Sequence, residues 1–199
     1  NQALGVLFGA EERWEEAAGH CRRRLAATTD PQQKLELNRR LGVILGTKLQ
    51  RGDDALTSWN HVLEQDPKNL EALRALLPLH AERAHWSEFV DVARRLVPLA
   101  SPSEAKDVRF HLARVLGEEQ GDVQAAVRLA REVRATEPHT PEELGRLGEM
   151  LARIGAWEDA VSTLEKAAAL ESGAGQRVLR YYAAVAIYRD KLGRPHDAA

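Results

Sequence analysis

The sequence is poor in cysteine and aromatic residues, and it contains no long hydrophobic run. With Cys21 as the one cysteine, no internal disulfide can form, so the fold does not depend on an oxidising compartment. No apolar run approaches the roughly 20 residues that span a bilayer, and no signal-peptide pattern opens the chain. The cytoplasm is therefore the default expectation. Aromatic residues are only 5% of the chain, and the Leu, Ala and Val that remain favour an all-helical protein.

Neither sign of charge predominates, because the formal net charge is only -2. Nucleic-acid binders usually carry a basic excess, so a polyanionic partner is not expected from the whole chain. At 44% hydrophobic and 29% charged, the 199 residues are those of a folded chain that buries a substantial core.

The common catalytic, metal and nucleotide motifs are absent: there is no HExxH, CxxC, GxxxxGK or GxGxxG. His20 precedes Cys21, but Cys21 falls on a position that the repeat described below predicts to be buried. His80 and His85 are five residues apart, which does not place two side chains on one helix face. The sequence predicts no catalytic residue, no metal site and no cofactor, and hence no enzyme.

A repeat runs through the chain, with a unit length close to the roughly 34 residues of known helix-pair repeats. Its marker is a small or apolar residue that directly follows a short stretch of acidic or aromatic residues, as in RWEEA and AWEDA. The six markers are Ala17, Ala55, Phe89, Ala126, Ala160 and Ala198. Units two and four match best, so the step from Ala55 to Ala126, here called the two-repeat step, indicates duplication of a two-repeat block.

A second mark stands twelve or thirteen residues before each of the first five markers, where a large apolar residue precedes a usually small one. These pairs are Leu4-Gly5, Leu41-Gly42, Leu76-Leu77, Leu112-Ala113 and Leu147-Gly148. Small residues at a helix crossing allow two antiparallel helices to approach to about 8–10 Å. Each unit is therefore predicted to be a helix pair, with further buried positions four and seven residues after the marker.

Glycine and proline punctuate the pattern. Turns within pairs are expected at Gly52-Asp53, Gly121-Asp122, Gly155 and Gly193, as left-handed helix ends. Asp-Pro, Ser-Pro, Glu-Pro and Thr-Pro steps mark the boundaries between units. Pro78 lies inside an expected helix and should kink or shorten it.

These residues resemble the tetratricopeptide repeat family, and unit five, PEELGRLGEMLARIGAWEDAVSTLEKAAAL, is the best match. The resemblance implies an all-α fold, a right-handed α-solenoid of about five to six antiparallel helix pairs, similar to a segment of a longer bacterial array. The predicted units of this single solenoid are 1–31, 32–69, 70–102, 103–140, 141–174 and an incomplete 175–199.

The resemblance also implies a concave surface made by the first helix of each pair, where a partner protein or peptide binds. The positions that it places there are Arg39, Arg40, Arg74, Phe110, His111, Arg114, Arg146, Glu149, Arg153, Tyr182 and Arg189. Arginine dominates, so acidic groups on the partner are one expectation. The other is that nearby Glu36, Glu71, Asp107 and Glu142 simply neutralise the arginines.

A protein-interaction scaffold is thus the leading hypothesis. The alternatives are a regulatory or spacer arm of a larger multidomain enzyme or secretion assembly and, less favoured because of the overall charge, an RNA-binding helical repeat. The Lys and Asn that clamp a C-terminal carboxylate in some family members are missing. An unpaired apolar face around Tyr181, Ala184 and Tyr188 predicts a tendency to dimerise through the last unit.

Overall fold

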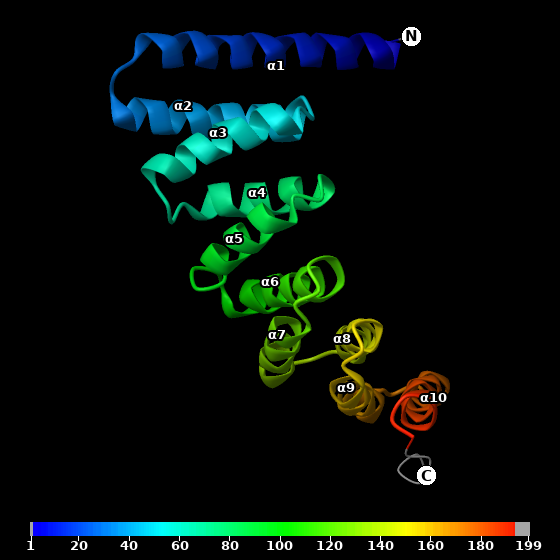
Figure 1. Ribbon diagram of the computed structural model, residues 1–199. Helices are drawn as coiled ribbons and strands as arrows, with labels where there is room; N and C mark the ends of the chain where they lie inside the picture. Colours follow the sequence, from blue (N-terminus) through cyan, green and yellow to red (C-terminus); the bar gives the residue numbers. More distant parts are fainter. Residues whose placement is uncertain (1, 194–199) are drawn as a thin grey trace. The chain divides into compact units, whose positions relative to one another are not determined.

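The computed structural model describes the backbone of residues 2–193 and the side chains of residues 13–193. Over this range every regular element is a helix (Figure 1). The α-helices are α1 Gln2–Ala27, α2 Pro31–Val43, α3 Gly52–Gln65, α4 Leu70–Glu82, α5 Trp86–Leu96, α6 Pro102–Arg114, α7 Val123–Ala135, α8 Pro141–Arg153, α9 Trp157–Leu170 and α10 Ala174–Asp190. The predicted all-α class is confirmed.

The chain divides into two compact units, an N-terminal unit of residues 1–99 and a C-terminal unit of residues 100–199. The N-terminal unit contains α1 and the pairs α2/α3 and α4/α5; the C-terminal unit contains the pairs α6/α7 and α8/α9, followed by α10. Within each pair a short turn joins the helices, so they run antiparallel (Figure 1).

The first predicted unit is not a helix pair, because α1 continues unbroken for 26 residues. The segment between its two marks carries no proline and no Gly-Asp step, and Glu, Ala and Arg sustain the helix. The last predicted marker, Ala198, lies outside the described residues.

Side-chain caps fix the starts of several helices where the sequence places boundaries. Asp30, Asn69 and Ser101 each accept a hydrogen bond from the backbone of the first turn, and proline follows Asp30 and Ser101 directly. Thr140 and Glu143 form a reciprocal capping box at the start of α8. These caps are formed by the residues that predicted the boundaries between units.

The two spacings of the second mark, twelve and thirteen residues, have a structural cause. In units two and four the first helix ends in a π-helical turn, Ile44–Lys48 (η1) and Val115–Glu119 (η2), and one two-repeat step separates these turns. Arg51 N–H donates to Leu45 O at 2.8 Å, and Asp122 N–H donates to Leu116 O at 2.8 Å. The π-turn absorbs the one extra residue of these units.

The turn within each of the four described helix pairs contains one residue with positive φ, at equivalent repeat positions. Gly121 and Gly155 adopt positive φ as predicted, with φ of 71° and 79°, and so does Gly193 after α10, with φ of 61°. The predicted Gly52 does not, because Gln50 takes the left-handed position at φ 52° while Gly52 begins α3. Gly52 instead accommodates the guanidinium of Arg83, which lies where a β-carbon would be.

The predicted core positions are buried. Cys21 is 6% exposed, and the positions four and seven residues after the markers of later units, Trp59 and Val62 among them, are at most 6% exposed. Pro78 does not shorten its helix, since α4 continues through it to Glu82 and has the same 13 residues as α8.

Candidate functional site

The predicted arginines of the N-terminal unit lie on its first helices, and two of them are near carboxylates. Arg39 on α2 donates from Nε to Glu71 Oε2 on α4 at 2.8 Å and from Nη1 to Glu36 Oε2 at 2.9 Å. Arg40 lies 4.0 Å from Glu36, and Arg74 on α4 also has an interaction. Arg39 and Arg40 are therefore paired within the protein itself.

Most of the predicted arginines of the C-terminal unit are also paired. Arg153 donates to Glu118 Oε1 at 2.7 Å, and Arg114 lies 3.8 Å from the same glutamate. Arg189 donates to its neighbour Asp190 at 2.6 Å. Tyr182 on α10 is 67% exposed, and Glu149 is exposed on α8.

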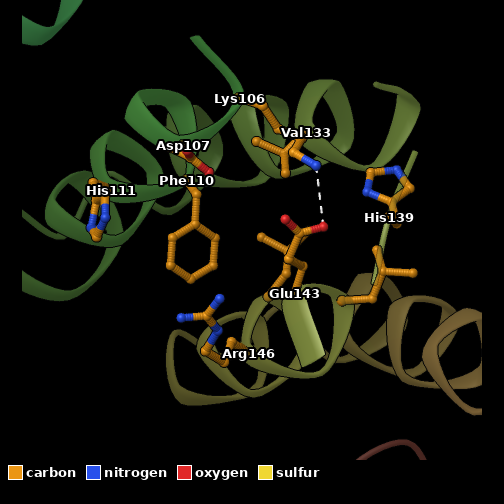
Figure 2. A pocket seen from close by; sticks show the side chains of 10 residues that line it. Lys106, Asp107, Phe110, His111, Val133, His139, Glu143 and Arg146 are labelled. Atoms are coloured by element: carbon orange, nitrogen blue, oxygen red, sulfur yellow. Dashed lines mark hydrogen bonds and ion pairs between the residues drawn. The ribbon is translucent and has the colours of Figure 1, made fainter. Parts of the chain in front are cut away.

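Phe110, His111 and Arg146 are different, because the fold brings these three predicted residues to one pocket between α6 and α8 (Figure 2). The pocket has a volume of about 140 Å³, close to the roughly 150 Å³ that holds one benzene ring. It is lined by Lys106, Asp107, Phe110, His111, Val133, His139, Glu143, Leu144, Arg146 and Leu147.

One wall of the pocket is a hydrogen-bonded network. Lys106 Nζ donates to Glu143 Oε2 at 3.1 Å, the dashed line in Figure 2, and to Pro138 O at 2.9 Å. Glu143 also accepts from Thr140 N at 3.0 Å. The Thr140 N–H and then Lys106 lower the pKa of Glu143, so the carboxylate is charged at neutral pH. The network joins α6, the loop before α8 and α8, and it fixes the shape of the pocket.

Arg146 has no carboxylate partner in the described part of the chain. Its guanidinium carbon lies 5.9 Å from the centroid of the Phe110 ring, within the range of a cation–π contact. Its side chain is exposed at the rim, and its hydrogen-bond donors remain accessible. On the neighbouring helix, partial desolvation and then the charge of Arg114 lower the pKa of His111, which favours the neutral imidazole.

His139 bounds the pocket at the end away from Phe110 and Arg146 (Figure 2). Its Nε2 lies 2.8 Å from Arg134 O. Because a carbonyl only accepts, Nε2 carries the hydrogen, and Nδ1 is left as an acceptor. That Nδ1 is buried and has no hydrogen-bond partner among the described residues.

Sequence reasoning missed Lys106, His139 and Glu143 as site residues. The capping-box spacing of Thr140 and Glu143 was a legible signal, and Lys106 stands one helical turn before Phe110 on the same face. Nothing local pointed to His139, whose loop position is set by contacts with α7.

The remaining candidates show no further chemistry. His80 and His85 have ring centroids 5.9 Å apart, but His80 is a buried residue, only 5% exposed, rather than a surface polar one. The described residues contain no cluster of three or more His, Cys, Asp or Glu side chains that could hold a metal ion. Nor does any helix in that part of the chain have the length and apolar character to cross a membrane.

The predicted apolar face of the last unit is partly present. Tyr181 is 44% exposed and Tyr188 is half-buried, but Ala184 is only 2% exposed, because that side of α10 packs onto α9. The exposed apolar residues of α10 are instead Val178, Leu179, Tyr181 and Tyr182. Dimerisation through this helix stays a prediction.

Known structures share this fold. A crystal structure of MamA matches with a TM-score of 0.63 and 19% sequence identity, over 84% of this chain and 87% of that one. PilF of Pseudomonas aeruginosa matches with a TM-score of 0.54 and 14% identity, over 97% of this chain and 90% of that one. At such identities the likeness is one of fold. No curated protein matches the sequence.

The sequence itself matches the family model of the tetratricopeptide repeat twice, at residues 2–35 and 143–178. These segments correspond to the first and fifth predicted units. Between them the structure has three further helix pairs with equivalent buried positions, and two of these pairs, α2/α3 and α6/α7, also have a small residue at the helix crossing. Both matched segments are therefore tetratricopeptide repeats, and the chain has the all-α solenoid fold that such repeats build.

Proposed function

We propose that this protein is a non-catalytic scaffold that binds a peptide or partner protein on the surface of its first helices, α2 and α4 in one unit and α6 and α8 in the other. Tetratricopeptide repeat proteins generally mediate protein–protein interactions and are typically not enzymes. The observation that carries the proposal is the α6–α8 pocket, which combines an apolar floor with an arginine that no internal carboxylate engages.

The stiffness of this surface supports the proposal. Salt bridges link successive first helices in both units, from Arg39 to Glu71 and from Lys106 to Glu143. A surface whose side chains are already fixed loses little entropy when a partner binds, so the partner bears most of the ordering cost.

The test is capture of partners from a lysate of the source organism on the immobilised chain. The first-helix variant carries Arg40→Glu and Arg146→Glu. The matched control carries Arg94→Glu and Arg128→Glu, which reverse two exposed charges on the second helices α5 and α7. Circular dichroism confirms that each variant is folded.

A partner that the first-helix variant loses and the control retains supports the proposal. Equal binding by both variants contradicts the assigned surface, and a partner lost only from the control moves the site to the second helices. The absence of any captured protein contradicts the scaffold function itself.

A further inference from the structure

Resting on the proposed function, we infer that the α6–α8 pocket is a specificity site for a partner segment in which a large apolar side chain stands beside an acidic one. The apolar side chain enters the pocket, and the adjacent carboxylate binds Arg146.

The floor of the pocket selects the apolar group. Val133, Leu144 and Leu147 are buried core residues, with Leu144 and Leu147 each 1% exposed, and the half-buried ring of Phe110 adds an aromatic wall. A space of about 140 Å³ accepts one leucine-sized or phenyl side chain, because a cavity of roughly 150 Å³ accepts benzene. A polar side chain there would leave its hydrogen-bonding groups unpaired.

The charges of the rim select the acidic neighbour. Lys106 and Glu143 neutralise each other at 3.1 Å, whereas Arg146 lies over the Phe110 ring and pairs with no carboxylate of the described residues. A guanidinium held over an aromatic ring still presents its N–H edges, which match the two oxygens of a carboxylate.

Asp107 determines on which side of the apolar residue the bound segment can carry its acidic residue. It lines the same pocket from α6, beyond Phe110 from Arg146 in Figure 2. An acidic residue on the α6 side of the bound segment would meet this carboxylate, so only the α8 side accepts one. The site therefore distinguishes an acid on one side of the apolar residue from an acid on the other.

His139 closes the pocket at the end away from Arg146 (Figure 2). Its Nδ1 is buried and has no hydrogen-bond partner among the described residues. Because this atom is not accessible from the pocket, it does not select a group of the bound segment, and the ring acts as a wall.

The equivalent place in the N-terminal unit lacks this chemistry although its core is the same. The residues one two-repeat step earlier keep the apolar floor as Val62, Leu73 and Leu76. The other walls change: Phe110 corresponds to Arg39, Arg146 to Ala75, Lys106 to Leu35, Glu143 to Ala72 and His139 to Lys68. Packing thus accounts for the floor, while the polar and aromatic side chains are particular to the C-terminal unit.

The test uses fluorescein-labelled octapeptides of Ser and Gly around a two-residue core, measured by fluorescence anisotropy with the full chain. The cores are Leu-Glu, Glu-Leu, Leu-Gln, Leu-Lys and Ala-Glu. We expect either Leu-Glu or Glu-Leu to bind best. The cores Leu-Gln, Leu-Lys and Ala-Glu should bind at least about tenfold more weakly, because each loses a charged hydrogen bond or a buried side chain.

The variant Arg146→Glu should reverse the preference in favour of Leu-Lys, and Arg94→Glu, the same charge change on an exposed arginine of the second helix α5, should leave all affinities unchanged. Peptide addition should also shift the NMR resonances of the His139 ring and the Phe110 ring. Binding that is indifferent to the acid, to its order or to Arg146→Glu overturns the inference, as does the absence of any peptide binding. Lysate capture by the first-helix surface would then still support the scaffold, so the two failures are distinguishable.

Discussion

The N-terminal and C-terminal units can be compared residue by residue. When the sequence of the first is shifted by the two-repeat step, from Ala55 to Ala126, its helices, π-turn and core positions align with those of the second. Leu73 and Leu76 of the first coincide with Leu144 and Leu147 of the second, and all four are at most 1% exposed. The wall residues around them differ almost completely. Close packing restricts what a buried position accepts, whereas an exposed one is free to acquire a charge or an aromatic ring.

The largest expected effect tests the shared core. Leu76→Ala and Leu147→Ala each remove a fully buried side chain and should each lower the free energy of unfolding by about 2–5 kcal/mol. Urea unfolding followed by circular dichroism measures both. A loss below about 1 kcal/mol at either position would show that the alignment of the two units is wrong there.

The second effect concerns the helix crossing, which the units build differently. In the N-terminal unit Gly42 faces Trp59, and a β-carbon on Gly42 would lie 2.6 Å from that ring. In the C-terminal unit the equivalent residues are Ala113 and Ala130. Gly42→Ala should therefore cost about 1–3 kcal/mol by overpacking.

The double variant with Trp59→Ala sharpens this point. With the ring removed, Gly42→Ala should become almost neutral, so the two changes are strongly non-additive in a double-mutant cycle. Additive losses from the two substitutions would mean that Gly42 is required for some reason other than its contact with Trp59.

The third effect is a dependence of stability on pH, which comes from a buried histidine of the N-terminal unit, His80. His80 is buried where the C-terminal unit has Leu151. Burial, and more weakly the positive charges of His85 and Arg83, lower the pKa of His80 below its usual 6.5, while Glu88 opposes the shift. The unfolded chain therefore takes up the proton first, and stability that is complete above pH 6.5 falls as the pH drops below it.

His80→Leu should remove this loss, which is at most about 1.4 kcal/mol per pH unit for one proton. Urea unfolding at a series of pH values between neutral and mildly acidic, for the wild type and for His80→Leu, measures the difference. Parallel curves for the two proteins would exclude His80 as the titrating group.

The smallest effect concerns the turns. The C-terminal unit has Gly121 and Gly155 at its left-handed positions, where the N-terminal unit has Gln50 and Ala84 with φ of 52° and 54°. Gln50→Gly and Ala84→Gly should each raise stability by about 0.5–1 kcal/mol, because glycine adopts positive φ without steric cost.

Gly121→Ala provides the reverse test. A β-carbon on Gly121 would have no neighbouring atom within 4 Å, so only the backbone conformation can resist the change. Thermal unfolding should show a loss of similar size to the gain at Gln50. Unchanged stability in all three variants would mean that the turns tolerate alanine-like residues at positive φ.

The limits of sequence reasoning are visible in particular residues. The repeat spacing and the caps located nearly every helix, and the extra residue of units two and four was countable before its π-turn was known. The continuity of α1 was not predicted, because the marks Leu4-Gly5 and Ala17 satisfy the repeat pattern although no proline and no Gly-Asp step lies between them. The left-handed role given to Gly52 was wrong because glycine serves close approach as well as turns.

The sequence by itself determined the all-α repeat and its buried positions, since these follow from local propensity and apolar spacing. Only the tertiary structure decided which arginines pair with carboxylates, and that Arg146 pairs with none among the described residues. Arg39 meets Glu71 after 32 residues and Lys106 meets Glu143 after 37. Such pairs depend on the packing of successive first helices, and so does the pocket that Phe110, His139 and Arg146 enclose.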